Sequence, residues 1–442
     1  MSSIPTPRKQ LSTDALIARI RQHFEHIDDR SGNPTTTIRL ADALMAGFAL
    51  FSLKDPSLLA FDQRRVADAD NLKRLYHIDH VPADTTLREI LDPVNEEQIR
   101  PVFKMVFGEL QRQNVLASFR VLGDYYVLAI DGTEYFTSKT ICCEHCLQKH
   151  HRDGSTTYHH QMLGASIVCP GRSEVIALMP EPILKQDGDN KNDCERNAFQ
   201  RFLPKFRVDH PHLRTIAVLD ALYANAPVIA DLRDAHVRWI IRVKESGNAF
   251  LFEQVRELSA RGETQEFRCL GKDGVLRFYE IAKHVPLNAS NPHVRVDFLS
   301  VREPLGNDGW YQATWIVDPL LRLAPGIAVE CEQIGRSRWK VENETFNTLK
   351  NQGYHFEHNY GHGHRNLSVV LMMLMMLAFL VDQTAQICCP LFAAALAASH
   401  SKRALWERQR EIYHQFQVRS FAEIYAAIVE GKKLSLEMAW DP

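Results

Sequence analysis

The spacing of apolar and polar positions changes along this chain, and the changes divide it into regions. In residues 1–118, apolar side chains recur every three or four positions, which is typical of amphipathic helices. We therefore predict a helical N-terminal domain at residues 1–118. Polar residues that can cap helices precede the apolar runs at Ser12, Thr13, Thr85, Thr86 and Asn95.

The function of this helical domain stays open between two interpretations. Its basic residues are consistent with a domain that binds DNA ends, and equally with a helical scaffold that has a solvated charged surface. These residues are Arg8, Lys9, Arg64, Arg65, Lys73 and Arg74.

Short runs of β-branched and aromatic residues replace the helical spacing after residue 119. We assign residues 119–244 to the first part of an α/β core, in the order strand, strand, strand, helix, strand, helix, strand. The expected strands are 125–130, 161–169, 174–180, 215–219 and 239–243, and the expected helices are 191–206 and 226–235.

Four further strand signals indicate a β-rich insertion at residues 245–325. Turn sequences Lys272-Asp273-Gly274 and Asn307-Asp308-Gly309 separate them. Residues 326–365 then resume the core with one helix, and residues 366–442 form a helical C-terminal region. The apolar run Leu367 to Val381 would span roughly 22 Å as a helix, short of a ~30 Å bilayer core, so we predict a buried helix.

The stretch Gly335 to Lys350, GRSRWKVENETFNTLK, predicts an amphipathic helix with an acid on its apolar face. At about 100° per residue, Glu342 lies in the middle of the apolar stripe, and Glu344 points the opposite way. A carboxylate that faces a core needs a cation or hydrogen bonds. Either Arg338, one turn earlier, pairs with Glu342, or Glu342 binds a metal together with other carboxylates.

Charge and composition limit the kinds of partner and the cellular compartment that we expect. The net charge of −2 shows no global basic field, so a nucleic-acid partner would bind at local basic surfaces. Nine cysteines in a long chain do not indicate a disulfide framework. The N-terminal stretch has no apolar segment of the secretory type, and we expect a cytoplasmic protein.

Two further acids can complete a metal site with Glu342. Asp131 and Asp220 each follow a buried apolar run, and carboxylates are the ligands that Mg²⁺ and Mn²⁺ prefer. Two such ions can activate an attacking oxygen and stabilise the leaving one in phosphodiester chemistry. We predict that Asp131, Asp220 and Glu342 are catalytic metal ligands.

The motifs around these acids resemble the DDE-type transposases of bacterial insertion sequences. They read AIDGTEYF at 129–136, VLDALYANAPVI at 218–229 and RSRWKVENETFNTLK at 336–350, and QDGDNKNDCE at 186–195 fits the same group. The Asp220-Ala221-x-Tyr223 pattern and the Arg338–Glu342 spacing match the family's second and third acid motifs. Two departures stand out. Gly335 replaces the family's tyrosine, and Lys350 follows Glu342 by eight residues rather than seven.

The resemblance implies an RNase H-like mixed sheet with a β-rich insertion between the second and third acids. It also implies metal-dependent cleavage at transposon ends, strand transfer into target DNA, and at least a homodimer to hold two terminal inverted repeats. Arg338 would orient Glu342 or hold a phosphate. Tyr223 would stack on or hydrogen-bond near the end nucleotide, or pack in the core, and Lys350 would contact DNA. Two alternatives are a non-mobile DNA-binding or regulatory relative and another RNase H-like metal nuclease.

Two clusters of cysteine and histidine raise further site hypotheses. Cys143 and Cys146 form a CxxC pair that a structural zinc ion could occupy together with nearby histidines or Cys194; an ordinary Cys- and His-rich loop is the alternative. The other cluster, YHFEHNYGHGH, follows the acid helix. From it we select His358 as a DNA-contacting residue near the active site, while a solvated turn is the other interpretation.

Overall fold

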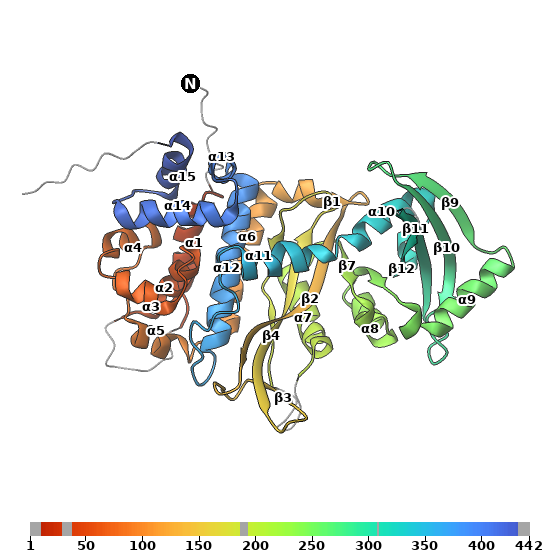
Figure 1. Ribbon diagram of the computed structural model, residues 1–442, viewed down its shortest axis with the longest axis horizontal. Coiled ribbons are helices and arrows are strands. Elements are labelled where there is room, and N and C mark those ends of the chain that lie inside the picture. The colour runs from red at the N-terminus through yellow and green to blue at the C-terminus, as the bar shows by residue number, and fades with distance from the viewer. Residues whose placement is uncertain (1–9, 29–37, 186–192, 307–308, 432–442) are drawn as a thin grey trace, which may run out of the picture. The chain divides into compact units, whose positions relative to one another are not determined.

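The structure is a computed structural model that describes residues 10–28, 38–185, 193–306 and 309–431 (Figure 1). Arg8, Lys9, the segment 186–192 with the expected helix start at Lys191, and the Asn307-Asp308 turn lie outside these residues. The chain divides into two compact units. The sheet unit comprises Asn114–Glu134 and His160–Phe346, and the helical unit comprises Met1–Gln113, Tyr135–His159 and Asn347–Pro442.

A mixed β-sheet forms the sheet unit, with strand order β4-β2-β7-β8-β12-β11-β10-β9. β2, β7 and β8 run parallel, whereas the pairs β8–β12, β12–β11, β11–β10 and β10–β9 are antiparallel. The strands are β1 Arg120–Val121, β2 Tyr125–Ser138, β4 Thr156–Val168, β5 Ile176–Ala177, β6 Glu181–Ile183, β7 Thr215–Leu219, β8 Arg238–Arg242, β9 Gln265–Leu270, β10 Leu276–Pro286, β11 Arg295–Leu305 and β12 Gly309–Val317. All five residues of β7 are buried, as expected for a parallel strand covered on both faces. The sequence-based prediction of an α/β, RNase H-like core with helical flanks is confirmed.

The predicted β-rich segment continues this sheet. Its last strand, β12, pairs antiparallel with β8, so β9 to β12 extend the core sheet sideways. Helix α9, Ala249–Ala260, was not expected in this β-rich segment and packs on β10 (Figure 1). The remaining helices of the unit are α7 Glu195–Asp209, α8 Ala226–Asp234 and α10 Pro325–Arg336, with short 3₁₀ turns at Val115–Phe119, Ala221–Tyr223, Glu245–Gly247 and Pro319–Leu321.

Two strand boundaries differ from the prediction. β2 does not stop at Asp131-Gly132 but runs on to Ser138, because β4 beside it keeps the backbone extended where the sequence indicates a break. The single strand expected at 174–180 is instead the two short strands β5 and β6, both paired with β4.

Helices from both ends of the chain form the helical unit. They are α1 Thr13–Glu25, α2 Leu40–Ser52, α3 Leu58–Arg64, α4 Ala69–Tyr76, α5 Asp84–Leu91, α6 Arg100–Arg112, α11 Asn347–Asn351, α12 Leu367–Cys388, α13 Pro390–Ser399, α14 Lys402–Gln415 and α15 Phe421–Glu430, with a 3₁₀ turn at Glu96–Gln98 and strand β3 at Leu147–His150. Ser12 and Asn95 cap as predicted, although Asn95 caps the 3₁₀ turn rather than α6 itself. Helix α12 is long and apolar enough to cross a membrane, but its apolar stretch is entirely buried among the other helices, as predicted.

A buried ion pair connects Lys54 to helix α12 inside this unit. The ammonium group of Lys54, which has no exposed side-chain surface, pairs with Asp382 of α12 and also donates to the carbonyl of Ser52 at 2.9 Å. The hydroxyl of Tyr354 donates to Asp382 at 2.5 Å, and the ring of Trp406 lies 4.0 Å from the Lys54 nitrogen. Each charge is thus compensated inside the core.

Candidate active site

Asp131 and Asp220 lie at the same level on neighbouring parallel strands. The β2–β7 register pairs Tyr126 with Thr215 and ends with Ala129 opposite Val218. Each aspartate lies two residues beyond this last pair, and adjacent strands are about 4.8 Å apart. Asp220 follows the end of β7 as predicted, and its Oδ1 accepts the Leu222 N–H at 2.9 Å. The sheet therefore brings these two predicted acids together.

Arg338 joins Asp131 to Glu342. Its guanidinium lies 2.8 Å from Oδ2 of Asp131 and 2.5 Å from Oε1 of Glu342. The local pairing of Arg338 with Glu342 expected from their spacing is present. The additional contact with Asp131 was not expected, and it places one cation between two of the predicted metal ligands.

The single amphipathic helix predicted at Gly335 to Lys350 is wrong. Helix α10 ends at Arg336, a turn follows, and Val341–Phe346 form a π-helical segment ahead of α11. Because a turn and a π segment do not advance by 100° per residue, the positions do not follow the helical wheel. The side chain of Glu342 is 47 % exposed rather than buried, and Trp339, placed near the apolar stripe, is 45 % exposed.

Burial and hydrogen bonds shift the pKa values of Asp131 and Glu342. Burial raises the pKa of Asp131 to about 7, and a hydrogen bond with Glu342 adds to the rise, while Arg338 opposes it. Burial acts to raise the pKa of Glu342, but hydrogen bonds from Asp131 and Arg338 outweigh it and hold that pKa below its ordinary value. Asp131 therefore holds the proton that the pair shares, and Glu342 carries the negative charge.

The structure adds a fourth acid, Glu195, that the sequence analysis did not select. Burial raises its pKa, and the nearby charge of Asp220 acts in the same direction. Glu195 begins α7 and lies against Gly132, where an added Cβ would be 2.6 Å from its Oε2. The sequence signal was the acidic Asp193-Cys194-Glu195 that closes the family-like motif before a helix.

Of the two interpretations of Tyr223, the structure agrees with the one in which it packs in the core. Its ring is fully buried, lies edge-on to Phe199 at 5.1 Å, and its hydroxyl donates to Oε1 of Glu195 at 2.7 Å. A buried ring cannot stack on a nucleotide. We therefore correct the stacking assignment and assign Tyr223 to the positioning of Glu195.

A hollow of about 390 Å³ opens next to Asp220. Basic and aromatic side chains line it: Arg242, Lys244, Arg336, Arg338, Tyr311, Trp315 and Trp339. Burial lowers the pKa of Arg242, and the charges of Arg336 and Arg338 contribute to the lowering. The ring of Trp315 leaves no room for a larger residue at position 335, because a Cβ there would lie 2.7 Å from its Nε1. This contact explains why Gly335 stands where the family has a tyrosine.

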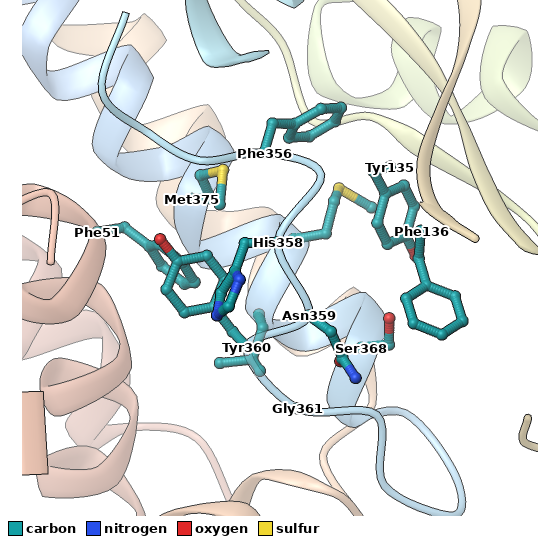
Figure 2. Close-up of a pocket in the computed structure, with 12 residues that line it drawn as sticks. Phe51, Tyr135, Phe136, Phe356, His358, Asn359, Tyr360, Gly361, Ser368 and Met375 are labelled. Atoms are coloured by element: carbon teal, nitrogen blue, oxygen red, sulfur yellow. The ribbon is translucent and has the colours of Figure 1, made fainter. Parts of the chain in front are cut away.

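Lys350 and His358, which we predicted to contact DNA, belong to the helical unit. The ammonium group of Lys350 lies 2.8 Å from Oε1 of Glu357. Figure 2 shows His358 beside Tyr360 at a small hollow of about 30 Å³, and their rings meet edge-on at 4.9 Å. Burial lowers the pKa of His358, which favours its neutral form. Both DNA-contact assignments stay predictions.

Cys143 and Cys146 lie close together, with sulfur atoms 3.8 Å apart, and His362 is their neighbour. Of the other expected ligands, His150 and His151 are exposed and lie at hydrogen-bonding distance from Thr156 and Thr157. Cys194 is exposed at the start of α7.

Two comparisons with known proteins bear on this site. A search of curated proteins gives no match. The family model of the transposase DDE domain matches residues 122–380, which include Asp131, Asp220 and Glu342. The match covers more than half of the chain, and the arrangement of the acids agrees with it. The chain therefore belongs to the family of transposases with a DDE domain.

Proposed function

We propose that the protein cleaves DNA at transposon ends in a metal-dependent reaction and transfers the cut strands into target DNA. The observation that supports this activity most directly is the meeting of three acids on separate elements. Asp131 and Asp220 lie level on adjacent strands, and Arg338 contacts both Asp131 and Glu342. Nothing in sheet packing requires acids at these positions, since buried charge destabilises a core unless it is compensated.

The donor set fits divalent metal ions. Oxygen ligands from carboxylates suit Mg²⁺ and Mn²⁺. Burial is the main cause of the raised pKa of Asp131 and of Glu195, neighbouring acids add to it, and a bound cation would offset both effects. Asp131, Asp220 and Glu342 would hold two ions. When bound, such ions activate an attacking oxygen and stabilise the leaving one.

The neighbouring hollow offers a path for a DNA strand. Arginine guanidinium groups bind phosphates in a bidentate manner, and exposed indole rings stack on unpaired bases. Arg242, Arg336 and Lys244 would hold the backbone, and Trp339 would stack on a base. These side chains lie within one hollow with Asp220, so a bound strand would pass directly over the acids.

Each remaining residue has a proposed role in this scheme. Arg338 orients Glu342 and Asp131 and becomes a phosphate ligand when those acids bind metal. Glu195, held by Tyr223, supplies negative charge beside Asp131. Lys350 and His358 contact DNA from the helical unit. The partners are terminal inverted repeats and target DNA, the active form is at least a homodimer, and the reaction occurs in the cytoplasm.

Supercoiled plasmids that carry the inverted repeats flanking this reading frame provide the test. With Mg²⁺, the protein should cut at the repeats and join the cut ends to target DNA. Asp131→Ala, Asp220→Ala and Glu342→Ala should each abolish joining while repeat binding in a gel-shift assay persists. Glu344→Ala is the matched control, an identical change two residues from Glu342, and should retain activity.

Other outcomes would identify other functions. Cutting without joining would indicate another RNase H-like nuclease. Binding to repeats with neither step would indicate a regulatory relative. Joining that survives all three substitutions would refute the assignment of the acids.

A further inference from the structure

A second group of potential metal ligands lies in the helical unit, and the proposed DNA chemistry does not use it. One ligand atom from each of Cys143, Cys146 and His362 lies within 4.8 Å of the other two. The two sulfurs are 3.8 Å apart, and Sγ of Cys146 is 3.2 Å from Nε2 of His362. Cys146 is 1 % exposed and His362 is 7 % exposed, so the group is largely shielded from solvent.

These distances match a tetrahedral metal site. With zinc–sulfur bonds of about 2.3 Å and zinc–nitrogen bonds of about 2.0 Å, tetrahedral angles place two sulfurs roughly 3.8 Å apart and a sulfur and a nitrogen roughly 3.5 Å apart. The observed values of 3.8 Å and 3.2 Å lie near both. A disulfide would require the sulfurs to approach to about 2.05 Å. The spacing thus favours a bridging ion over a bond between the cysteines.

The surroundings orient the three ligands of the helical unit. The backbone N–H of Cys143 points to Sγ of Cys146 at 3.4 Å, a donor that stabilises a thiolate. The ring of Phe136 lies 4.4 Å from that of His362 and restrains its rotation. Supporting contacts of this kind hold metal ligands in place.

We propose that Cys143, Cys146 and His362 bind one structural zinc ion. Thiolate and imidazole ligands select zinc over the hard ions that suit the carboxylate site. Cys146 and His362 are buried, so the ion is shielded from solvent and stabilises the fold rather than taking part in DNA chemistry. Cys146 and His362 are 216 positions apart, and the ion would tie the loop before β3 to the loop before α12.

Elemental analysis of the purified full-length chain tests this proposal. We expect one zinc ion per chain after dialysis, and its loss in Cys146→Ser and His362→Ala. Cys142→Ser is the matched control, because it makes the same change in the exposed cysteine next to Cys143 and should keep the zinc. Chelation should lower the melting temperature of the wild type and of Cys142→Ser.

Cobalt substitution keeps the proposal testable if the deletion variants do not fold. Cobalt in the wild type should give the visible bands of a tetrahedral site with two thiolates. His362→Cys keeps a ligand at each of the three positions and should bind cobalt with stronger thiolate charge-transfer absorption. Iron in place of zinc, a Cys143–Cys146 disulfide in the freshly purified protein, or equal zinc content in all variants would overturn the proposal.

Discussion

Gly164 offers a way to displace the acid-bearing π segment without changing any acid. Gly164 is buried in β4, and a Cβ added there would lie 2.5 Å from Cε1 and 2.7 Å from Cζ of Phe346. Ordinary contact begins at 3.4 Å, so the ring must retreat by at least about 0.9 Å, the difference between the two distances. Phe346 is 5 % exposed and ends the π segment that carries Glu342.

The segment has little room to absorb this shift elsewhere. The hydroxyl of Thr345 lies 3.2 Å from that of Ser166 and ties the segment to β4. Inserting a methyl group into a packed core destabilises a fold by roughly 1–3 kcal/mol, and a 1 Å displacement of a reacting group can reduce a rate about 100-fold. We therefore expect Gly164→Ala to reduce strand joining 10- to 100-fold and to lower the melting temperature by roughly 2–10 °C.

Plasmid joining assays and thermal melting measure the two effects. Adding Phe346→Leu to Gly164→Ala removes ring atoms from the clash and should restore most of the joining. Gly326→Ala is the control, because its Cβ would meet no atom within 4 Å. If Gly164→Ala joins DNA at the wild-type rate, packing against Phe346 does not position Glu342.

Three further substitutions test other parts of the structure. Glu195→Gln should reduce joining 10- to 100-fold, as loss of a group that supports metal ligands does, and unchanged joining in a plasmid assay would remove Glu195 from the site. Lys54→Met leaves Asp382 buried without its cation and should lower the free energy of unfolding in denaturant by about 3–5 kcal/mol; Asp382→Leu in the same chain should recover most of it, and additive losses would contradict the coupling. Because burial raises the pKa of Asp131 from 3.8 to about 7, the metal-free fold binds an extra proton in that interval and loses stability as pH rises through it, by up to about 1.4 kcal/mol per pH unit. Asp131→Asn should flatten this part of the stability–pH curve. The loss of stability below pH 4.5 through the lowered pKa of Glu342 should become smaller but persist, because Arg338 still lowers that pKa; parallel curves for the two proteins would refute the perturbation.

The sequence was informative where one local pattern determines both an element and its chemistry. Runs such as TIAVL predict buried strands, and an acid directly after a run predicts a carboxylate at the sheet edge, which located Asp220 and, with a wrong strand end, Asp131. Glu342 was selected by its motif and by a helical wheel, and the wheel failed. A wheel assumes a uniform rise and turn, and the turn after α10 and the π segment depart from both.

Residues whose role depends on contacts with distant parts of the chain could not be identified from local sequence patterns. Glu195 is distinguished by Tyr223 and Gly132, contacts that only the folded chain creates. For Cys146, the sequence indicated nearby histidines as partners, whereas the neighbouring ring is that of His362, 216 positions away. The spacing of residues along the sequence can identify ligands that share a loop, but it cannot identify ligands from distant parts of the chain.

The π segment Val341–Phe346 also bears on how this helix could have acquired its length. A π turn holds about one residue more than an α turn, so it absorbs an inserted residue locally. In a regular α-helix the same insertion would rotate every later side chain by about 100°. The eight-residue interval from Glu342 to Lys350, one longer than is typical of the family, is what such an insertion would leave behind. The π turn would thus add one residue to the helix and keep the side chains that follow it on the same face.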